Sequence, residues 1–185
     1  PGTGKTTTLA SRIHELMAMN EQCRILVLTP TNKACDVLTL AVADAGESSP
    51  WLGRFLTTGE ERIEAEGYLV DKYDNLYEQD KCCIVTTIAR LPYDGFNGNS
   101  DGLLFKDIEW DYIIIDEASM IPLAQVVYAI YRFPTSEIII AGDPKQITPI
   151  VREHEWKDEN IYKMVGLNNF ANPVTEPIQF RVENL

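Results

Sequence analysis

The sequence predicts an α/β fold, a mostly parallel sheet with helices on both faces. Two observations lead to this prediction. Segments with the 3.6-residue spacing of amphipathic helices alternate along the chain with short, continuously apolar runs, which are typical of parallel strands buried on both faces. The apolar runs are RILVLT, CCIVTT, YIII and EIIIA. Alternating strands and helices imply right-handed crossovers and ligands at the carboxyl ends of the strands.

The first predicted element is an amphipathic helix that follows the opening stretch PGTGKTTT. Its apolar residues fall on one face at helical spacing, namely Leu9, Ile13, Leu16 and Met17. Arg24 to Thr29 is then predicted as a central strand that ends at Pro30. A second helix runs from there to Gly46, with Thr31 or Asn32 placed to cap its start.

Residues 47–81 interrupt the alternation of strands and helices. Leu69, Tyr73, Leu76 and Tyr77 repeat as on a helix among many acidic residues, which predicts an acidic helical insertion packed on the main sheet. Such a surface is a candidate docking site for a protein partner.

The remaining elements return to the alternating order. Strands are predicted at Cys82 to Thr87, Tyr112 to Ile115 and Glu137 to Ala141, and a surface loop at Tyr93 to Gly102. Pro122 opens the helix between the last two strands. A short helix is predicted at Asn160 to Leu167.

Composition limits the classes of protein that fit. The 185 residues suggest one domain, and 45% apolar residues suffice for a sizeable core. The chain shows neither a membrane-length apolar stretch nor the order of a secretory signal, so an intracellular protein is expected, cytoplasmic or nuclear, without membrane contact. The four cysteines are expected to be reduced structural thiols. A net charge of −12 excludes a generally basic nucleic-acid surface, so any such contact is local.

The opening stretch matches the end of a phosphate-binding loop. In the pattern G-x-x-x-x-G-K-[ST], backbone N–H groups cradle phosphates, while the Lys and hydroxyl reach the terminal phosphates and Mg²⁺. Gly4, Lys5 and Thr6 supply the last three positions, at the positive end of a helix dipole. An ordinary Gly-containing turn before a helix is the alternative.

Polar clusters follow each predicted strand. Asp116 and Glu117 leave YIII together, and paired acids at this place hold Mg²⁺ and deprotonate an attacking water in P-loop enzymes. Gln146 in GDPKQ would lie beside a γ-phosphate, with Asp143 positioning its loop, although Gly-Asp-Pro also forms simple turns. TNKACD is similar to the guanine-reading Asn-Lys-x-Asp, but its spacing is one residue too long and Asp36 falls within a helix, which disfavours a GTPase.

Taken in order, the motifs PGTGKT, LTPTNKACD, VTTIARL, IIIDEAS, GDPKQITPI and IQFRV resemble superfamily 1 helicases, nearest to the Upf-type branch. The resemblance implies that residues 1–185 are part of a RecA-like motor domain whose first strand is missing. A second RecA-like domain, absent from this chain, would complete an ATP-dependent motor on single-stranded DNA or RNA.

The resemblance also assigns roles to residues. For ATP and Mg²⁺ it implies contacts from Gly2, Thr3, Gly4, Lys5, Thr6, Thr7, Asp143 and Gln146. Thr6 and Asp116 would ligate the metal, Glu117 would be the catalytic base, and Arg181 would reach the γ-phosphate. The nucleic-acid backbone would meet Pro30, Thr31, Asn32, Thr86 and Thr87, whose hydroxyl, amide and backbone groups bind phosphate without a basic surface.

Two other functions remain open at this point. A non-helicase P-loop ATPase or nucleotide switch would use DEAS and GDPKQ for a protein partner and hydrolyse ATP independently of nucleic acid. A non-catalytic interaction module would tolerate loss of Lys5 or Glu117.

Overall fold

The computed structural model describes residues 4–93, 95–96, 103–143 and 159–165. Its α-helices are α1 (Lys5–Met19), α2 (Asn32–Asp44), α3 (Glu61–Ala65), α4 (Leu123–Arg132) and α5 (Ile161–Met164). Its strands are β1 (Cys23–Thr29), β2 (Leu52–Phe55), β3 (Leu69–Val70), β4 (Lys81–Thr87), β5 (Gly95–Phe96), β6 (Leu103–Leu104), β7 (Tyr112–Ile115) and β8 (Glu137–Ile140). Short 3₁₀ turns are η1 (Leu76–Glu78), η2 (Ile88–Arg90), η3 (Phe105–Asp107) and η4 (Ala118–Met120).

Six strands form one sheet in the order β3-β2-β4-β1-β7-β8. Every strand pair in it is parallel, which confirms the predicted α/β class. The strand β1 lies inside the sheet between β4 and β7. Its side chains alternate between two cores: Ile25 and Val27 join one, Leu26 and Leu28 the other.

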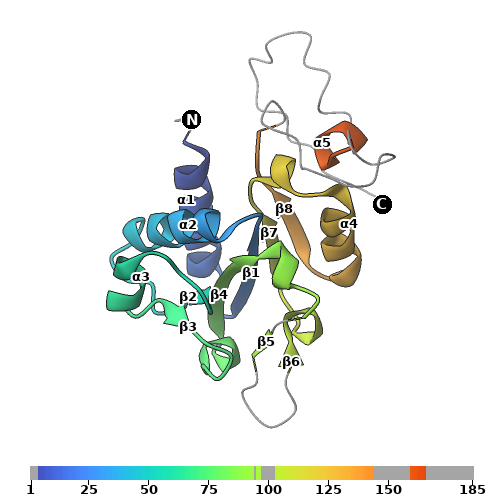
Figure 1. The fold of residues 1–185 in the computed structure, drawn as a ribbon. Coiled ribbons are helices and arrows are strands. Elements are labelled where there is room, and N and C mark those ends of the chain that lie inside the picture. Colours follow the sequence, from blue (N-terminus) through green and yellow to red (C-terminus); the bar gives the residue numbers. More distant parts are fainter. Residues whose placement is uncertain (1–3, 94, 97–102, 144–158, 166–185) are drawn as a thin grey trace.

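Helices cover both faces of this sheet (Figure 1). On one face, α1 and α2 bury the apolar residues that the periodicity had indicated, including Leu9, Ile13 and Leu16. On the other face lies α4, which buries Leu123, Val126 and Ala129. The predicted strands and the first, second and fourth α-helices are thereby confirmed.

The prediction of a helical insertion at residues 47–81 is wrong in its secondary structure. This segment adds strands β2 and β3 to the sheet, and β2 pairs directly with β4. Leu69 lies in β3, whereas Leu76 and Tyr77 lie in the turn η1. Leu69 is half-buried and Tyr73 is exposed, so only Leu76 and Tyr77 are buried and the helical spacing of the four does not mark one buried face. The one α-helix in this segment is α3, of five residues.

The predicted loop at Tyr93 to Gly102 lies partly outside the described residues. Within the described part, Gly95–Phe96 pairs antiparallel with Leu103–Leu104 to form a small separate sheet. The predicted helix near the C-terminus is observed as α5, after Asn160, whose side chain accepts a hydrogen bond from Lys163 N at 2.9 Å. Residues 166 and 167 of that prediction lie outside the described residues.

Among the described residues, no helix combines the length and the apolar character needed to span a bilayer. The carboxyl ends of β7 and β8 and the N-terminus of α1 lie at the same end of the molecule (Figure 1). The fold therefore gathers at one edge the described parts of the polar clusters that the sequence placed after each strand.

Candidate nucleotide and nucleic-acid sites

The first candidate site begins at the N-terminus of α1. Gly4 adopts a left-handed conformation (φ 72°), which favours glycine, and its carbonyl accepts the first helical hydrogen bond from Thr8 N at 2.8 Å. Lys5 and Thr6 follow half-buried in the first turn, and Thr7 is exposed. The free N–H groups and positive dipole of a helix start favour an anion such as phosphate at this position.

The second part of this site is the turn that leaves β7. Asp116 continues the pairing of β7 with β1, since its N–H donates to Leu28 O at 2.9 Å. The next turn is tied to the end of β8 by the hydrogen bond from Ala118 N to Ala141 O, 3.0 Å. The backbone on both sides of Glu117 is therefore held by the sheet itself.

Glu117 carries an unusual backbone conformation at this turn. Its φ of 51° and ψ of 39° lie in the left-handed region, which a non-glycine residue rarely adopts. Asp116 Oδ1 accepts a hydrogen bond from Glu117 N at 2.8 Å and helps to hold it there. Within the described part of the chain, the buried Glu117 Oε2 has no hydrogen-bond partner. A strained backbone and an unpaired buried oxygen together are typical of a functional site.

The pKa of Asp116 is affected by its burial and by the charges of its neighbours, among them Lys5. Burial raises the pKa of the Asp116 carboxyl above its ordinary value and the charge of Glu117 raises it further, while the Glu117 N–H and the Lys5 ammonium act in the opposite direction. Two partly desolvated carboxylates beside a lysine fit a divalent cation, which neutralises them. The residues present, with the Thr6 hydroxyl at the start of α1, therefore suit Mg²⁺.

A tyrosine that sequence reasoning missed completes this site. Tyr162 in α5 is buried, and its hydroxyl has no hydrogen-bond partner among the described residues. Burial raises its pKa, as do the charges of Asp116, Glu117 and Asp143, so all three carboxylates lie near it. A Cβ on Gly142 would collide with the Tyr162 hydroxyl. Nothing in the local sequence around Tyr162 indicates this position, because it depends on the contact of α5 with the distant turn η4.

The structure thus brings together Gly4, Lys5, Thr6, Asp116, Glu117 and Asp143 at one edge. Four other residues assigned to nucleotide binding or catalysis, Gly2, Thr3, Gln146 and Arg181, lie outside the described residues. Their roles stay predictions.

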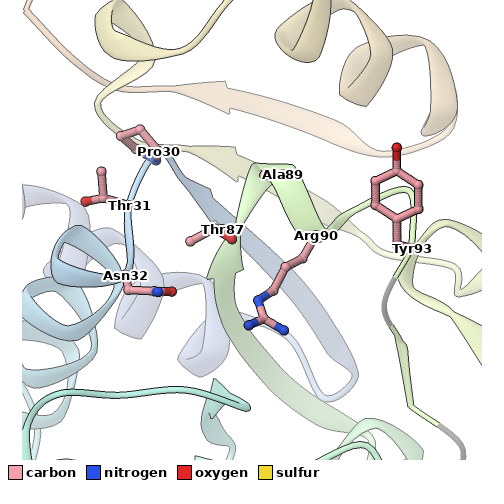
Figure 2. A pocket seen from close by; sticks show the side chains of 7 residues that line it. All are labelled: Pro30, Thr31, Asn32, Thr87, Ala89, Arg90 and Tyr93. Carbon is pink, nitrogen blue, oxygen red and sulfur yellow. The ribbon is translucent and has the colours of Figure 1, made fainter.

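The second candidate site is a groove of about 660 Å³ on the same edge of the sheet. Its lining comes from the loops after two neighbouring strands, β1 and β4, whose last residues Thr29 and Thr87 pair with each other. Figure 2 shows the seven residues that line it: Pro30, Thr31, Asn32, Thr87, Ala89, Arg90 and Tyr93.

Four of the five residues assigned to a nucleic-acid backbone line this groove. The fifth, Thr86, does not: it is fully buried within β4, because side chains alternate across a strand and Thr87 takes the outward position. Arg90 and Tyr93 were missed, although VTTIARLPY contains the basic and aromatic residues that bind phosphates and stack on bases. Tyr93 is 78% exposed.

The TNKACD segment starts α2, and Thr31 is its N-cap, with Ala34 N donating to Thr31 Oγ1 at 3.1 Å. Asp36 is buried inside the helix and pairs with Arg54, Nε to Oδ1 2.9 Å. Its carboxylate therefore does not face a ligand, in agreement with the rejection of a guanine-reading motif.

A family model described as "AAA domain" matches residues 1–152. A relative from Danio rerio named "Putative helicase mov-10-B.1" is 26% identical over 169 residues, covering 82% of this chain and 16% of the relative. The Schizosaccharomyces pombe "DNA replication ATP-dependent helicase/nuclease dna2" is 25% identical over 198 residues, covering 98% of this chain and 13% of the relative. The chain thus spans less than a fifth of either relative.

A solved structure of a Bacteroides Pif1 helicase double mutant aligns over 85% of this chain and 35% of its own, with 15% identity and a TM-score of 0.31. A TM-score this low supports no conclusion about the fold or the function of this chain. The relatives' names, together with the family match, confirm the resemblance to helicases that the ordered motifs indicated.

Proposed function

The chain belongs to the AAA domain family, and from that premise we propose that it is the ATP-binding motor domain of a helicase or translocase. In this proposal the complete protein couples ATP hydrolysis to movement along single-stranded DNA or RNA. One observation supports it above the others: a paired-carboxylate site at a helix N-terminus and a polar groove occupy the same edge of one sheet.

In the nucleotide half, the start of α1 would bind the phosphates. Lys5 would contact the β- and γ-phosphates, where its charge also offsets that of Asp116. Glu117, whose Oε2 lacks a partner among the described residues, would accept a proton from the attacking water. Its left-handed backbone sets the direction in which the side chain leaves the turn.

Mg²⁺ would be held by Asp116 and Thr6. The described residues contain no group of three or more His, Cys, Asp or Glu side chains arranged for a metal ion. In phosphoryl transfer, Mg²⁺ is bound by one or two protein carboxylates and otherwise by phosphates and water. Bound there, Mg²⁺ would neutralise the charge that develops on the phosphates.

In the nucleic-acid half, the groove would take the sugar-phosphate backbone. Among the described residues, its lining offers hydroxyl and amide groups and a single cation, Arg90, so binding would be local and compatible with a net charge of −12. The exposed ring of Tyr93 would stack on a base. Both features are tolerant of sequence, as a motor that moves along a strand requires.

Several parts of the proposal depend on the family resemblance alone. Gln146 would sense the γ-phosphate, Arg181 would reach toward it, and a second RecA-like domain elsewhere in the complete protein would close over the nucleotide. The small share of each relative that this chain spans is compatible with such an additional domain.

The test is the steady-state ATPase activity of the full-length protein that carries this chain, with and without dT20 or U20 oligonucleotides, at low and moderate salt. We expect strong stimulation by at least one oligonucleotide, weaker at higher salt because phosphate contacts release counterions. Lys5→Ala is the control and should abolish both basal and stimulated activity. Basal hydrolysis that neither oligonucleotide changes would instead favour a partner-regulated ATPase, and activity in Lys5→Ala would contradict the nucleotide site.

A further inference from the structure

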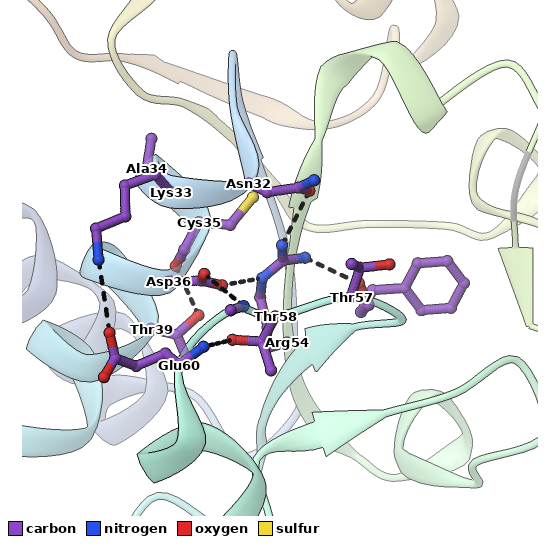
Figure 3. A network of polar contacts seen from close by, with 12 residues as sticks. Asn32, Lys33, Ala34, Cys35, Asp36, Thr39, Arg54, Thr57, Thr58 and Glu60 are labelled. Carbon is purple, nitrogen blue, oxygen red and sulfur yellow. Dashed lines mark hydrogen bonds and ion pairs between the residues drawn. The ribbon is translucent and has the colours of Figure 1, made fainter.

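A buried arginine lies directly beneath the groove. Arg54, in β2, is 0% exposed, and a fully buried guanidinium is rare unless its donors are paired. Figure 3 shows its surroundings. Arg54 Nε donates to Asp36 Oδ1 at 2.9 Å, Nη1 to Phe55 O at 2.8 Å and Nη2 to Asn32 Oδ1 at 3.1 Å.

These contacts join two elements that are separate in the sequence, the helix α2 and the strand β2. Asp36 and Asn32 are one helical turn apart in α2, so both face β2. The second Asp36 oxygen, Oδ2, accepts from Gly59 N at 3.2 Å. The carboxylate is therefore held from two sides, and the Arg54 side chain is fixed between α2 and its own strand.

The third bond decides which side of the Asn32 amide faces the groove. A guanidinium only donates hydrogen bonds, whereas a carboxamide has an accepting oxygen and a donating NH₂ group. The Asn32 oxygen must therefore face Arg54. Since Asn32 also lines the groove (Figure 2), its NH₂ group is left to face that space. A phosphate oxygen only accepts hydrogen bonds, so this orientation is the one that binds it.

We propose that Arg54 is a positioning residue for nucleic-acid binding: by holding the Asn32 oxygen it presents the Asn32 N–H groups to a backbone phosphate in the groove. This inference rests on the proposed function of the groove. Without Arg54 the amide can rotate and present its oxygen, which repels phosphate, so the strand should bind more weakly. Because the released amide can still rotate back, the bond to the phosphate is weakened rather than abolished, and we expect Kd to rise roughly three- to tenfold.

The main experiment removes the buried ion pair without leaving a charge unpaired. In the full-length protein, Asp36→Met is combined with Arg54→Met, because well-packed apolar residues often replace a buried ion pair without loss of stability. Binding of fluorescein-labelled dT20 and U20 is measured by anisotropy over a range of salt. We expect Kd to rise roughly three- to tenfold while the slope of log Kd against log salt stays unchanged, because no phosphate-binding cation is lost.

A double-mutant cycle separates orientation from general structure. Asn32→Ala in the otherwise native protein should weaken binding by a similar factor. In the double-Met background it should add little, because the amide is then already released from its position. The matched control is the exposed ion pair that also involves α2, Arg62 with Asp44; Asp44→Ala with Arg62→Ala should leave Kd as in the wild type.

Native-like Kd in a folded double-Met variant, or a full additional loss from Asn32→Ala within it, would overturn the role of Arg54. If the double-Met variant does not fold, Arg54→Lys replaces it. Lysine keeps the charge beside Asp36 but lacks the forked donors that reach Asp36 and Asn32 together. It should weaken strand binding to the same extent, and wild-type affinity would overturn the inference. A wild-type protein that binds neither oligonucleotide would instead overturn the proposed function, and the inference with it.

Discussion

At the scale of single residues, Glu117 is the proposed catalytic base and also has a strained backbone. Its left-handed conformation costs free energy of order 1–3 kcal/mol. The ionised form of the neighbouring Asp116 is also destabilised, because burial of its carboxyl raises its pKa. A strained backbone next to a desolvated carboxyl, both of which lower the stability of the fold, is typical of a site selected for catalysis rather than for stability.

Glu117→Gln in the full-length protein should therefore lower ATP turnover by roughly 10²–10⁴-fold, the range attributed to a general base. The amide keeps the size of the side chain, so Mg·ATP affinity should change little. Turnover and equilibrium nucleotide binding, measured separately, distinguish these effects. Unchanged turnover would remove Glu117 as the base.

Arg90 provides a second test at this scale. It is the single cation among the groove's lining residues, so Arg90→Gln should weaken strand binding and reduce the slope of log Kd against log salt by about one. The oligonucleotide anisotropy series over several salt concentrations measures both quantities. An unchanged slope would show that Arg90 does not contact a phosphate.

At the scale of elements, the strand β2 makes residues 47–81, which were predicted as an acidic insertion, part of the main sheet. It places Arg54 beneath the groove on one face of the sheet. On the other face Gly53 lies so close to its neighbours that an added Cβ would be 2.7 Å from Leu76 Cδ2 and 2.9 Å from Val70 Cγ2. Residues 47–81 are thus part of the core that supports the site.

Gly53→Ala should therefore lower the free energy of unfolding of the chain by about 1–3 kcal/mol through overpacking. Chemical denaturation monitored by circular dichroism measures it. Gly59→Ala is the matched control, because a Cβ there meets nothing within 4 Å, and it should be close to neutral. Equal stability of the two variants would contradict the packing of β2 against β3 and η1.

At the scale of the whole molecule, the reactivity of the four cysteine thiols measures whether the sheet and its helices stay packed. All are buried, three in β1 and β4 and one in α2. Burial raises the pKa of Cys23 to about 11 and that of Cys82 to about 12, and also raises the pKa of Cys35 and Cys83. They are inert structural groups in the folded chain.

Native thiols should accordingly resist alkylation at pH 8 and react only as fast as the chain opens. Because each folded pKa lies above the ordinary value of a thiol, 9.0, the unfolded thiols ionise first as the pH rises. Stability should therefore be retained below about pH 9 and fall above it. Alkylation rates and thermal unfolding between pH 7 and 10 measure both effects. Rapid stoichiometric labelling of native protein at pH 8 would contradict this burial.

The sequence by itself determined the elements whose signal is local. Long apolar runs such as RILVLT became strands, amphipathic spacing became α1, α2 and α4, and Thr31 became the cap of α2. Because the carboxyl ends of parallel strands meet at one edge of a sheet, the sequence also predicted that Lys5, Asp116 and the TPTN loop lie at the same edge. Periodicity and capping depend on neighbours in the chain, so they can be read from it.

Only the tertiary structure decided the rest. The strand LGRF is four residues long and contains Gly53 and Arg54, so its composition argues against a buried strand. It is stabilised by pairing with β3 and β4 and by the bonds of Arg54 to α2. The approach of Tyr162 to the carboxylates and the orientation of the Asn32 amide likewise depend on contacts between segments far apart in the chain. Such contacts leave no periodic pattern in the sequence, because they arise only when the separate segments pack together.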